Sequence, residues 1–229
     1  MKKYLIMAAM MVATLTAGAQ ARFEAGTFTM QPRLGGTGAM LTNTPDLKVE
    51  GQTIEATATG GEFVGLDFEY YLNKRLGIAA GINVAAAGTG WEDYNYTDDD
   101  GQKMKMKEQA YKTRYVNVPI TANWYVLKGF ALKAGVQFGF LTGADDYSRA
   151  ECSVLSTDYT IIAEEDIKDN FNKFDISIPI GLSYEFKVPI VIDLRYNFGV
   201  TKVNKHKTTT GDDMRNINAA LTLGYKFSL

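Results

Sequence analysis

The sequence is poor in the residues that build metal and nucleophilic sites. It contains one cysteine, Cys152, and one histidine, His206, in 229 residues. A single cysteine excludes an intrachain disulfide, and one cysteine with one histidine cannot supply the usual ligands of a transition-metal site. No nucleophile with a partner base is visible in the sequence. We therefore expect no metal, no cofactor and no enzymatic activity.

Long hydrophobic runs are also missing from most of the chain. After residue 19, no apolar stretch approaches the roughly 20 residues of a membrane-spanning helix, and a net charge of -2 gives no basic surface for nucleic acid. The one apolar run, residues 4–17, follows two lysines and precedes Ala17-Gly18-Ala19. A basic start, an apolar stretch and small residues are typical of a cleavable signal peptide. We predict a signal peptide over residues 1–19 and one mature domain over residues 20–229.

The clearest positive signal is an alternation with a period of two. In residues 174–186 the even positions are apolar, from Phe174 to Phe186, whereas the odd positions are mostly small or polar. Such alternation indicates a strand with two different faces. The other segments with this pattern are residues 27–37, 63–72, 76–86, 115–125, 130–141, 190–201 and 216–227. Together they predict eight strands, an even number as in single-chain outer-membrane barrels.

The connections between these segments alternate in length. Three are tight turns, at residues 73–75, 127–129 and 187–189. Four are long and polar, at residues 38–61, 87–114, 142–173 and 202–215. Short periplasmic turns and long extracellular loops are typical of outer-membrane barrels. The sequence therefore predicts an all-β fold, an eight-stranded antiparallel up-and-down transmembrane β-barrel in the cell outer membrane.

Alternation alone also permits a soluble lipocalin-like barrel, whose apolar faces would surround a ligand. The polar faces here carry mainly Gly, Ser, Thr, Asn and Ala with scattered charges, which is the composition of an interior. Aromatic side chains gather near the strand ends, where they would lie at the lipid headgroups. These residues are Tyr70, Trp124, Phe130, Tyr184, Phe186, Tyr225 and Phe227. We predict that the apolar faces contact outer-membrane lipid.

Charged residues of both signs occupy the inward positions of the strands. They are Arg33, Asp67, Glu69, Lys133, Asp175, Glu185, Asp193, Arg195 and Lys226. The interior of an eight-stranded barrel is just wide enough for its side chains, so these residues are expected to pair in a structural network that fills the lumen. The alternative is a narrow polar path or a binding pocket.

Two local features carry further predictions. Pro119 and Pro179 lie inside strands, where proline removes a ladder donor, so a bulge or bend is expected at each. Residues 98–101, Asp-Asp-Asp-Gly, fail the calcium-loop pattern because Lys107 takes the twelfth position, which requires an acid. They fit a hairpin tip instead. We expect the third and fourth strands to continue past the membrane, with Met104 and Met106 on the outward face.

Three segments carry a resemblance to a known family. Residues 115–125 (YVNVPITANWY), 174–186 and 223–227 resemble strands of the PorT-like outer-membrane β-barrel family of Bacteroidota, and the likeness spans nearly all of the mature chain. The resemblance implies a secreted barrel, in a family with one member tied to secretion and most without an assigned role. Here Phe227 is followed by Ser228 and Leu229, so the terminal aromatic lies two residues early. We still expect recognition by the barrel assembly machinery.

These observations lead to an expected role rather than to a ligand. We expect a monomer with a structural, surface-interaction or secretion-accessory role, whose long loops present a surface for partners. The sequence does not identify an extracellular or periplasmic protein partner. The loop at residues 142–173 contains the acidic stretch Glu164-Glu165-Asp166. The alternatives are a small-solute channel or binding barrel and, further, a lipid-modifying barrel enzyme, which would need a catalytic set at the outer rim.

Overall fold

The computed structural model describes residues 24–97, 101–154, 157–205 and 213–229. The predicted signal peptide, residues 1–19, lies outside these ranges, as do Asp98, Asp99, Asp100 and His206. The described chain is almost entirely strand, with one short 3-10 turn at Lys168–Asn170. None of its helical segments has the length and apolar character needed to cross a membrane.

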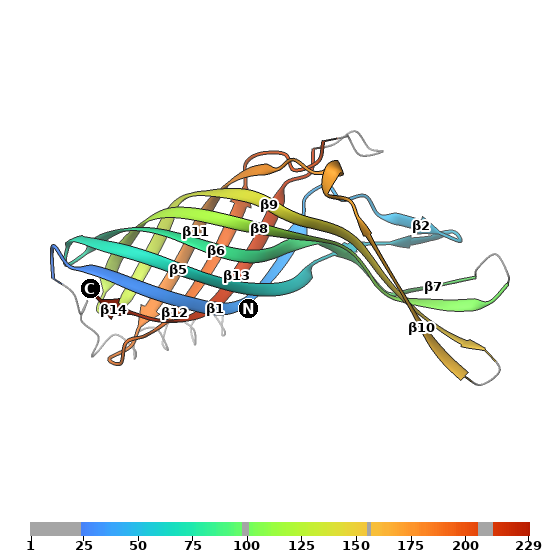
Figure 1. Ribbon diagram of the computed structural model, residues 1–229, viewed down its shortest axis with the longest axis horizontal. Helices are drawn as coiled ribbons and strands as arrows, with labels where there is room; N and C mark the ends of the chain where they lie inside the picture. Colours follow the sequence, from blue (N-terminus) through green and yellow to red (C-terminus); the bar gives the residue numbers. More distant parts are fainter. Residues whose placement is uncertain (1–23, 98–100, 155–156, 206–212) are drawn as a thin grey trace, which may run out of the picture.

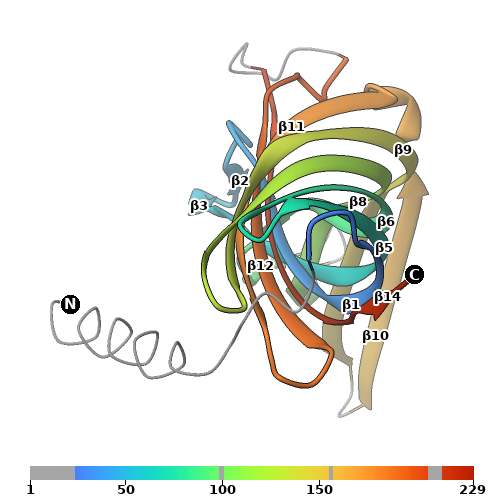
Figure 2. The same ribbon diagram turned by 90° about the vertical axis from the view of Figure 1, so that its left-hand side faces the viewer.

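Eight antiparallel strands close into a barrel (Figures 1 and 2). Their order around the ring is β1–β5–β6–β8–β9–β11–β12–β13, and β13 pairs with β1 again. The strands are β1 (Phe28–Leu41), β5 (Thr59–Asn73), β6 (Leu76–Trp91), β8 (Lys103–Leu127), β9 (Phe130–Val154), β11 (Phe174–Glu185), β12 (Ile190–Gly199) and β13 (Asn216–Tyr225). The prediction of an eight-stranded antiparallel barrel is confirmed. Closure matters because lipid offers no partner to an open sheet edge.

The side chains face as expected for a barrel surrounded by lipid. Large apolar residues lie on the outside, for example Ile178, which is 45% exposed, whereas the charged Asp193 inside is 1% exposed. A soluble barrel would place these residues the other way round, because water would solvate the charge and the core would bury the isoleucine. The lipocalin-like arrangement is therefore not the one adopted.

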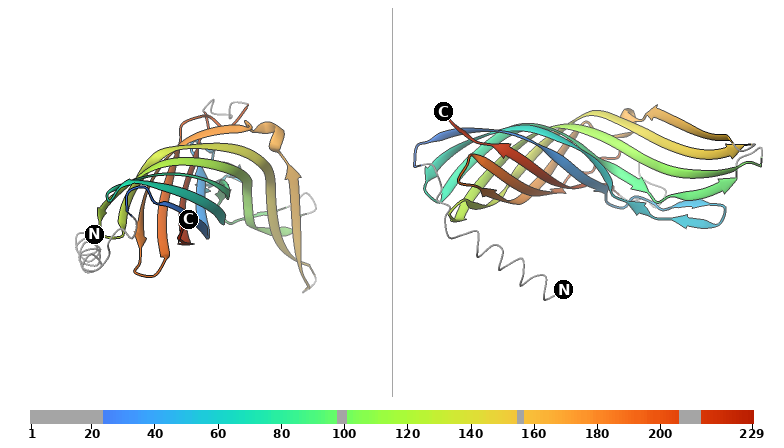
Figure 3. Two further views of the ribbon diagram at one scale, coloured as in Figure 1. Left: turned by 60° about the vertical axis from the view of Figure 1, so that its left-hand side comes forward. Right: turned by 90° about the horizontal axis from the view of Figure 1, so that it is seen from below.

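The strands β8 and β9 are 25 residues long each, whereas a tilted strand crosses the bilayer with about 9–11 residues. Most of the predicted loops at residues 87–114 and 142–173 are in fact strand. Beyond the barrel, β8 and β9 continue in a curved sheet that we call the extension (Figures 1 and 3). This sheet also contains β10 (Thr157–Asp166), β7 (Tyr94–Thr97) and the end of β6 with β4 (Ala56–Thr57), while β2 (Leu47–Val49) and β3 (Gln52–Ile54) form a separate two-stranded hairpin that belongs to the extension. The third and fourth predicted strands correspond to β6 and β8, and their expected continuation is confirmed.

The bulge or bend predicted at Pro119 and Pro179 does not take the form of a bulge, although one ladder is interrupted beside each proline. On one side, Pro179 pairs in register with Asn197 of β12. On the other side, the ladder between β11 and β9 lacks two pairs and then continues in the same register. That register places Gly135 opposite Pro179. The ladder lapses because proline has no N–H. Pro119 repeats the arrangement opposite Gly81.

Register shifts occur elsewhere, beside two of the short turns and at the base and middle of the extension. The β8–β9 register shifts between Met106 and Glu108, which leaves Lys107 as an extra residue, and again at Thr142. A bulge of one residue reverses the facing of everything beyond it. Met106 therefore packs on the concave face against Ile54, Trp91 and Tyr94, with Met104 also buried. The predicted outward facing of Met104 and Met106 is wrong for this reason.

Candidate functional site

The lumen of the barrel holds a central ion cluster. Asp193 on β12 accepts from Lys133 on β9, and its other carboxylate oxygen lies 3.0 Å from Nη1 of Arg33 and 3.7 Å from Nε of Arg195. Asp67 on β5 lies 3.4 Å from both Arg33 and Arg195. All five residues are buried. Three cations and two carboxylates thus join strands from opposite walls of the barrel.

A second ion cluster lies nearer the short turns. Lys226 Nζ is 3.0 Å from Oε2 of Glu69 and 3.2 Å from Oε2 of Glu185. The Tyr125 hydroxyl donates to Oε1 of Glu69 at 2.8 Å and lies 2.9 Å from the Tyr71 hydroxyl. Two carboxylates and one cation carry a net charge opposite in sign to that of the central cluster. The two clusters together are therefore neutral, which lowers the cost of burying them.

The outer half of the lumen is filled by amides and one carboxylate. Asp175 accepts from Thr201 Oγ1 and from Asn216 Nδ2, the latter at 3.0 Å. Nearby, Asn117 donates to Asn83 at 3.0 Å. The cavity among these side chains has a volume of about 10 Å³, room for one water molecule at most. The structure thus places all nine predicted lumen residues in the interior, where they form clusters at three levels.

An apolar cap covers the lumen at the end where the extension begins. The segments after β10 and β12 cross this mouth, and Asn172 N donates to the carbonyl of Val203 at 2.7 Å. The buried residues of the cap are Ala39, Leu41, Ala87, Tyr115, Leu141, Ala144, Phe171, Val203 and Met214. This cap was not predicted, because residues 167–173 and 202–215 have no regular period in the sequence.

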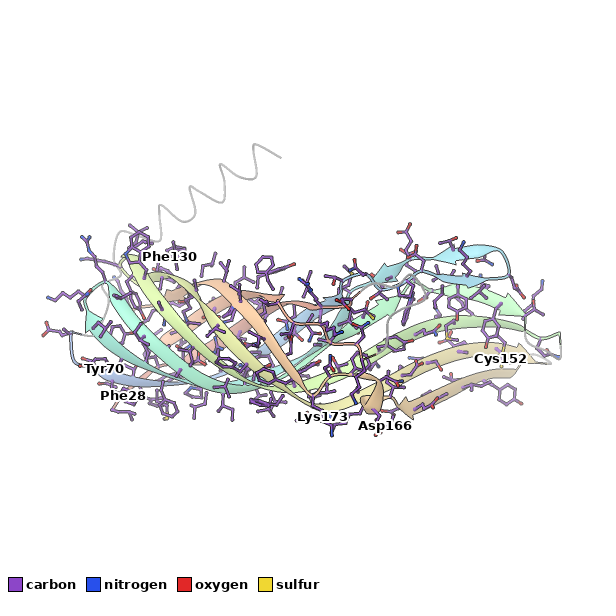
Figure 4. All side chains as sticks on the ribbon, turned by 90° about the horizontal axis from the view of Figure 1, so that it is seen from above. Phe28, Tyr70, Phe130, Cys152, Asp166 and Lys173 are labelled. Atoms are coloured by element: carbon purple, nitrogen blue, oxygen red, sulfur yellow. The ribbon has the colours of Figure 1, made fainter. Side chains whose placement is uncertain are left out.

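Aromatic side chains form two belts on the outside of the barrel. The seven predicted residues lie near the short turns, for example Trp124, which is 55% exposed. In Figure 4, Tyr70 and Phe130 lie at the end of the barrel far from the extension, together with Phe28, which sequence reasoning missed. A second belt near the mouth, including Phe140 and Phe174 with ring centroids 5.5 Å apart, was also missed.

The extension forms a trough rather than a closed tube (Figure 3). The β2–β3 hairpin packs on the concave face, where the Trp91 ring meets Tyr111 edge-on at 4.9 Å and Trp91 Nε1 donates to the Pro45 carbonyl at 3.1 Å. Toward the tip, a cleft of about 820 Å³ lies between this hairpin and β10. Its floor follows one row across four strands, from Tyr96 through Met104 and Cys152 to Tyr159.

The far wall of the cleft is β10, which pairs only with β9 among the described strands. Its residues 159–166 are all exposed. Near its base, burial and then the charge of Glu165 raise the pKa of the Asp146 carboxyl. The nearby acidic stretch Glu164-Glu165-Asp166, predicted to lie in a loop, is therefore the end of an edge strand. In Figure 4, Asp166 lies at the base of the extension and Cys152 at its far tip.

The chain was compared with curated protein sequences and with solved structures. A comparison with curated protein sequences finds no match. Among solved structures, Ail of Yersinia pestis, crystallised with the heparin analogue sucrose octasulfate, is 13% identical, with 87% of this chain and 99% of that chain covered and a TM-score of 0.41. OprG of Pseudomonas aeruginosa is 11% identical, with 92% and 100% covered and a TM-score of 0.44.

The family comparison covers more of the sequence. The family described as "Outer membrane protein beta-barrel domain" matches residues 18–205, which include most of the ring. The match agrees with the closed ring of eight antiparallel strands and with their apolar outer surface. The chain therefore belongs to the outer membrane protein beta-barrel domain family and resides in the cell outer membrane.

Proposed function

We propose that this protein is a monomeric surface-binding barrel, in which the barrel serves as the membrane anchor and the extension binds a partner outside the cell. One observation carries the proposal: β8 and β9 run for 25 residues each and leave the membrane together. At about 3.4 Å per residue, such strands reach roughly 85 Å. A barrel that served only to cross the bilayer would need less than half of that length.

The filling of the lumen supports binding over transport. A solute would have to pass the apolar cap, the amide layer and both ion clusters in turn. Breaking a buried ion pair by removing one partner costs about 3–5 kcal/mol, so transient opening of the central cluster would be rare. The cavity of about 10 Å³ in the outer half of the lumen is too small for any solute larger than water.

We also propose a subfamily for the chain, a structural role for its lumen carboxylates and a route of assembly. The sequence of residues 115–125 supports a PorT-like member of the family. An accessory role in secretion would use the same extension. The lumen carboxylates serve structure rather than catalysis, since Asp67, Glu69 and Asp193 are all engaged by basic side chains. Assembly of the chain depends on the barrel assembly machinery.

Photo-cross-linking on intact cells tests the proposal. A photoreactive phenylalanine analogue replaces Tyr159 at the cleft or, as the control, Ile178, which faces lipid. We expect protein adducts from Tyr159 and none from Ile178, because only the extension leaves the bilayer. Planar-bilayer recordings of the folded protein complete the test, with no conductance expected. Discrete conductance steps, together with no adducts at Tyr159, would favour the transport alternative.

A further inference from the structure

The strand β10 has a free edge. Residues Thr157–Asp166 pair with residues 145–154 of β9 and with no other strand in the described chain. The neighbour of β9 in the barrel, β11, pairs only with its residues 130–140 and does not reach the extension. One side of β10 therefore presents backbone N–H and C=O groups without a strand beside them, over a length of ten residues.

Both faces of β10 are exposed as well. Ile161 is 50% exposed and Ile162 is 60% exposed, and because successive side chains alternate, the two lie on opposite faces of the sheet. Tyr159, on the same face as Ile161, is 51% exposed. Edge strands are usually protected by being short, bulged or charged along their length. Residues 159–163 carry no charge and no bulge, so this part of the edge is open to another strand.

The base of β10 carries an excess of negative charge. The β10–β9 register places Asp166 opposite Asp145 and Glu165 opposite Asp146. Like charges directly opposite each other destabilise an antiparallel pair. Lys112 on β8 lies opposite Asp145, but its ammonium group is 2.7 Å from Glu108 and also contacts the ring of Tyr147. A nearby positive charge from outside the chain would relieve the repulsion.

We propose that the free edge of β10 binds an extended, basic segment of a partner protein as an added antiparallel strand. Apolar side chains of that segment cover Ile161 and Ile162, and its basic residues, near its N-terminal end, lie beside Glu164, Glu165 and Asp166. Strand addition to an exposed sheet edge gives affinity through the backbone and specificity through alternate side chains. The inference rests on the proposed function and names the partner chemistry for the same extension.

A second copy of this chain fits the edge less well. All copies in one membrane point their extensions outward, so β10 runs from the tip toward the barrel in each. Two such strands would meet in parallel, whereas antiparallel pairs are the more stable kind. Self-association would also bring two acidic segments together. A basic segment of another protein satisfies both the direction and the charge.

Synthetic peptides test the proposal with the folded, full-length barrel in nanodiscs. The probe is a ten-residue peptide of alternating valine and threonine with two lysines near its N-terminus, and its matched control carries two glutamates there. We expect the lysine peptide to bind at least tenfold more tightly. Methylating alternate backbone nitrogens on one edge of the peptide removes its donors and should abolish binding. Equal binding of the methylated peptide would overturn the proposal.

A charge-reversed barrel completes the test. In the double variant Glu164→Lys, Glu165→Lys the preference should switch to the glutamate peptide, while heat-modifiable gel mobility shows that the barrel is still folded. An unchanged preference in a folded double variant would overturn the assignment of the basic segment to this site. If Tyr159 forms adducts on cells and yet neither peptide binds, the strand-addition proposal fails and the surface-binding function stands. If neither adducts nor peptide binding occur, both fail.

Discussion

The guanidinium of Arg33 on β1 lies 3.0 Å from the carboxylate of Asp193 on β12, although β13 separates these two strands in the ring. Asp193 also contacts Lys133 on β9, on the other side of β11. One carboxylate therefore links three parts of the wall through the interior. Backbone ladders join only neighbouring strands, so these ion pairs are the cross-links that resist flattening of the barrel.

Asp193→Ala should destabilise the barrel more than Arg195→Ala. The first change leaves Arg33, Lys133 and Arg195 with only Asp67 among them, and breaking a buried pair costs about 3–5 kcal/mol. The second change leaves both carboxylates with at least one cation. The loss in free energy of unfolding should therefore be smaller, although the melting temperature should still fall. Urea titrations in detergent, read by gel mobility of folded and unfolded bands, give the order.

Asp213→Ala is the matched control for these two variants. Its carboxylate is about half exposed and lies 3.9 Å from Lys202, an arrangement worth about 0–1 kcal/mol. The urea midpoint of the Asp213→Ala variant should match that of the unchanged protein. Equal midpoints for all three variants would mean that the lumen network does not stabilise the barrel.

Gly135→Ala should impair folding, because a Cβ atom at this position would lie 1.9 Å from the carbonyl oxygen of Ile120 and 2.8 Å from Cα of Thr121. The strands cannot separate there without losing ladder bonds. Gly143→Ala is the control, since nothing lies within 4 Å of the added atom. We expect a loss of the folded band for the first variant and none for the second. A fully folded Gly135→Ala barrel would show that β8 and β9 can move apart at Gly135 without loss of the fold.

The barrel strands were predictable because lipid and a polar lumen impose different chemistry on alternate residues. The extension was predicted only as the continuation of the third and fourth strands. Its edge strand β10 was not predicted, because the sequence of Thr157–Asp166 carries no two-sided pattern. The facing of Met104 depended on the one-residue bulge at Lys107, which periodicity cannot reveal. The lumen charges follow from inward parity, whereas cap residues such as Phe171 and Val203 come from irregular segments and are identified only by their burial.

The contact between β9 and β10 should weaken as the pH rises. Burial and then the charge of Glu165 raise the pKa of Asp146 above its ordinary value of 3.8. The folded extension therefore binds this proton more tightly than the unfolded chain does. The resulting stability is present below the ordinary value and is lost as the pH rises through the raised value. Tyr111, which lies opposite Asp146 on β8, stays neutral in this range.

Hydrogen exchange of the β9–β10 ladder measures this effect, once the intrinsic dependence on pH has been removed. Protection should be greater near pH 4 than at pH 7, because Asp146, with its raised pKa, loses its proton as the pH rises between these two values. Glu165→Gln removes the second cause of the shift, so the difference between the two pH values should shrink. If Glu165→Gln leaves the pH dependence unchanged, the charge of Glu165 is not what holds the proton on Asp146.

The two tryptophans of the chain report on different parts of the molecule. Trp124 is 55% exposed on the lipid-facing side of β8, whereas Trp91 is 5% exposed and packs under the β2–β3 hairpin in the extension. A bromine atom quenches tryptophan only at short range, so brominated lipid distinguishes a residue in the bilayer from one beyond it. Trp91→Phe and Trp124→Phe each leave a single emitter in an otherwise unchanged fold.

In vesicles of lipid brominated near the headgroup, the Trp91→Phe protein should lose most of its emission, because Trp124 lies in the belt near the short turns. The Trp124→Phe protein should keep its emission, because Trp91 lies beyond the mouth, in the extension. Ordinary vesicles give the reference intensity for each variant. Strong quenching of Trp91 would place the extension in or on the membrane. Its cleft and its free edge at β10 would then face lipid, and the proposed surface-binding role would lose its basis.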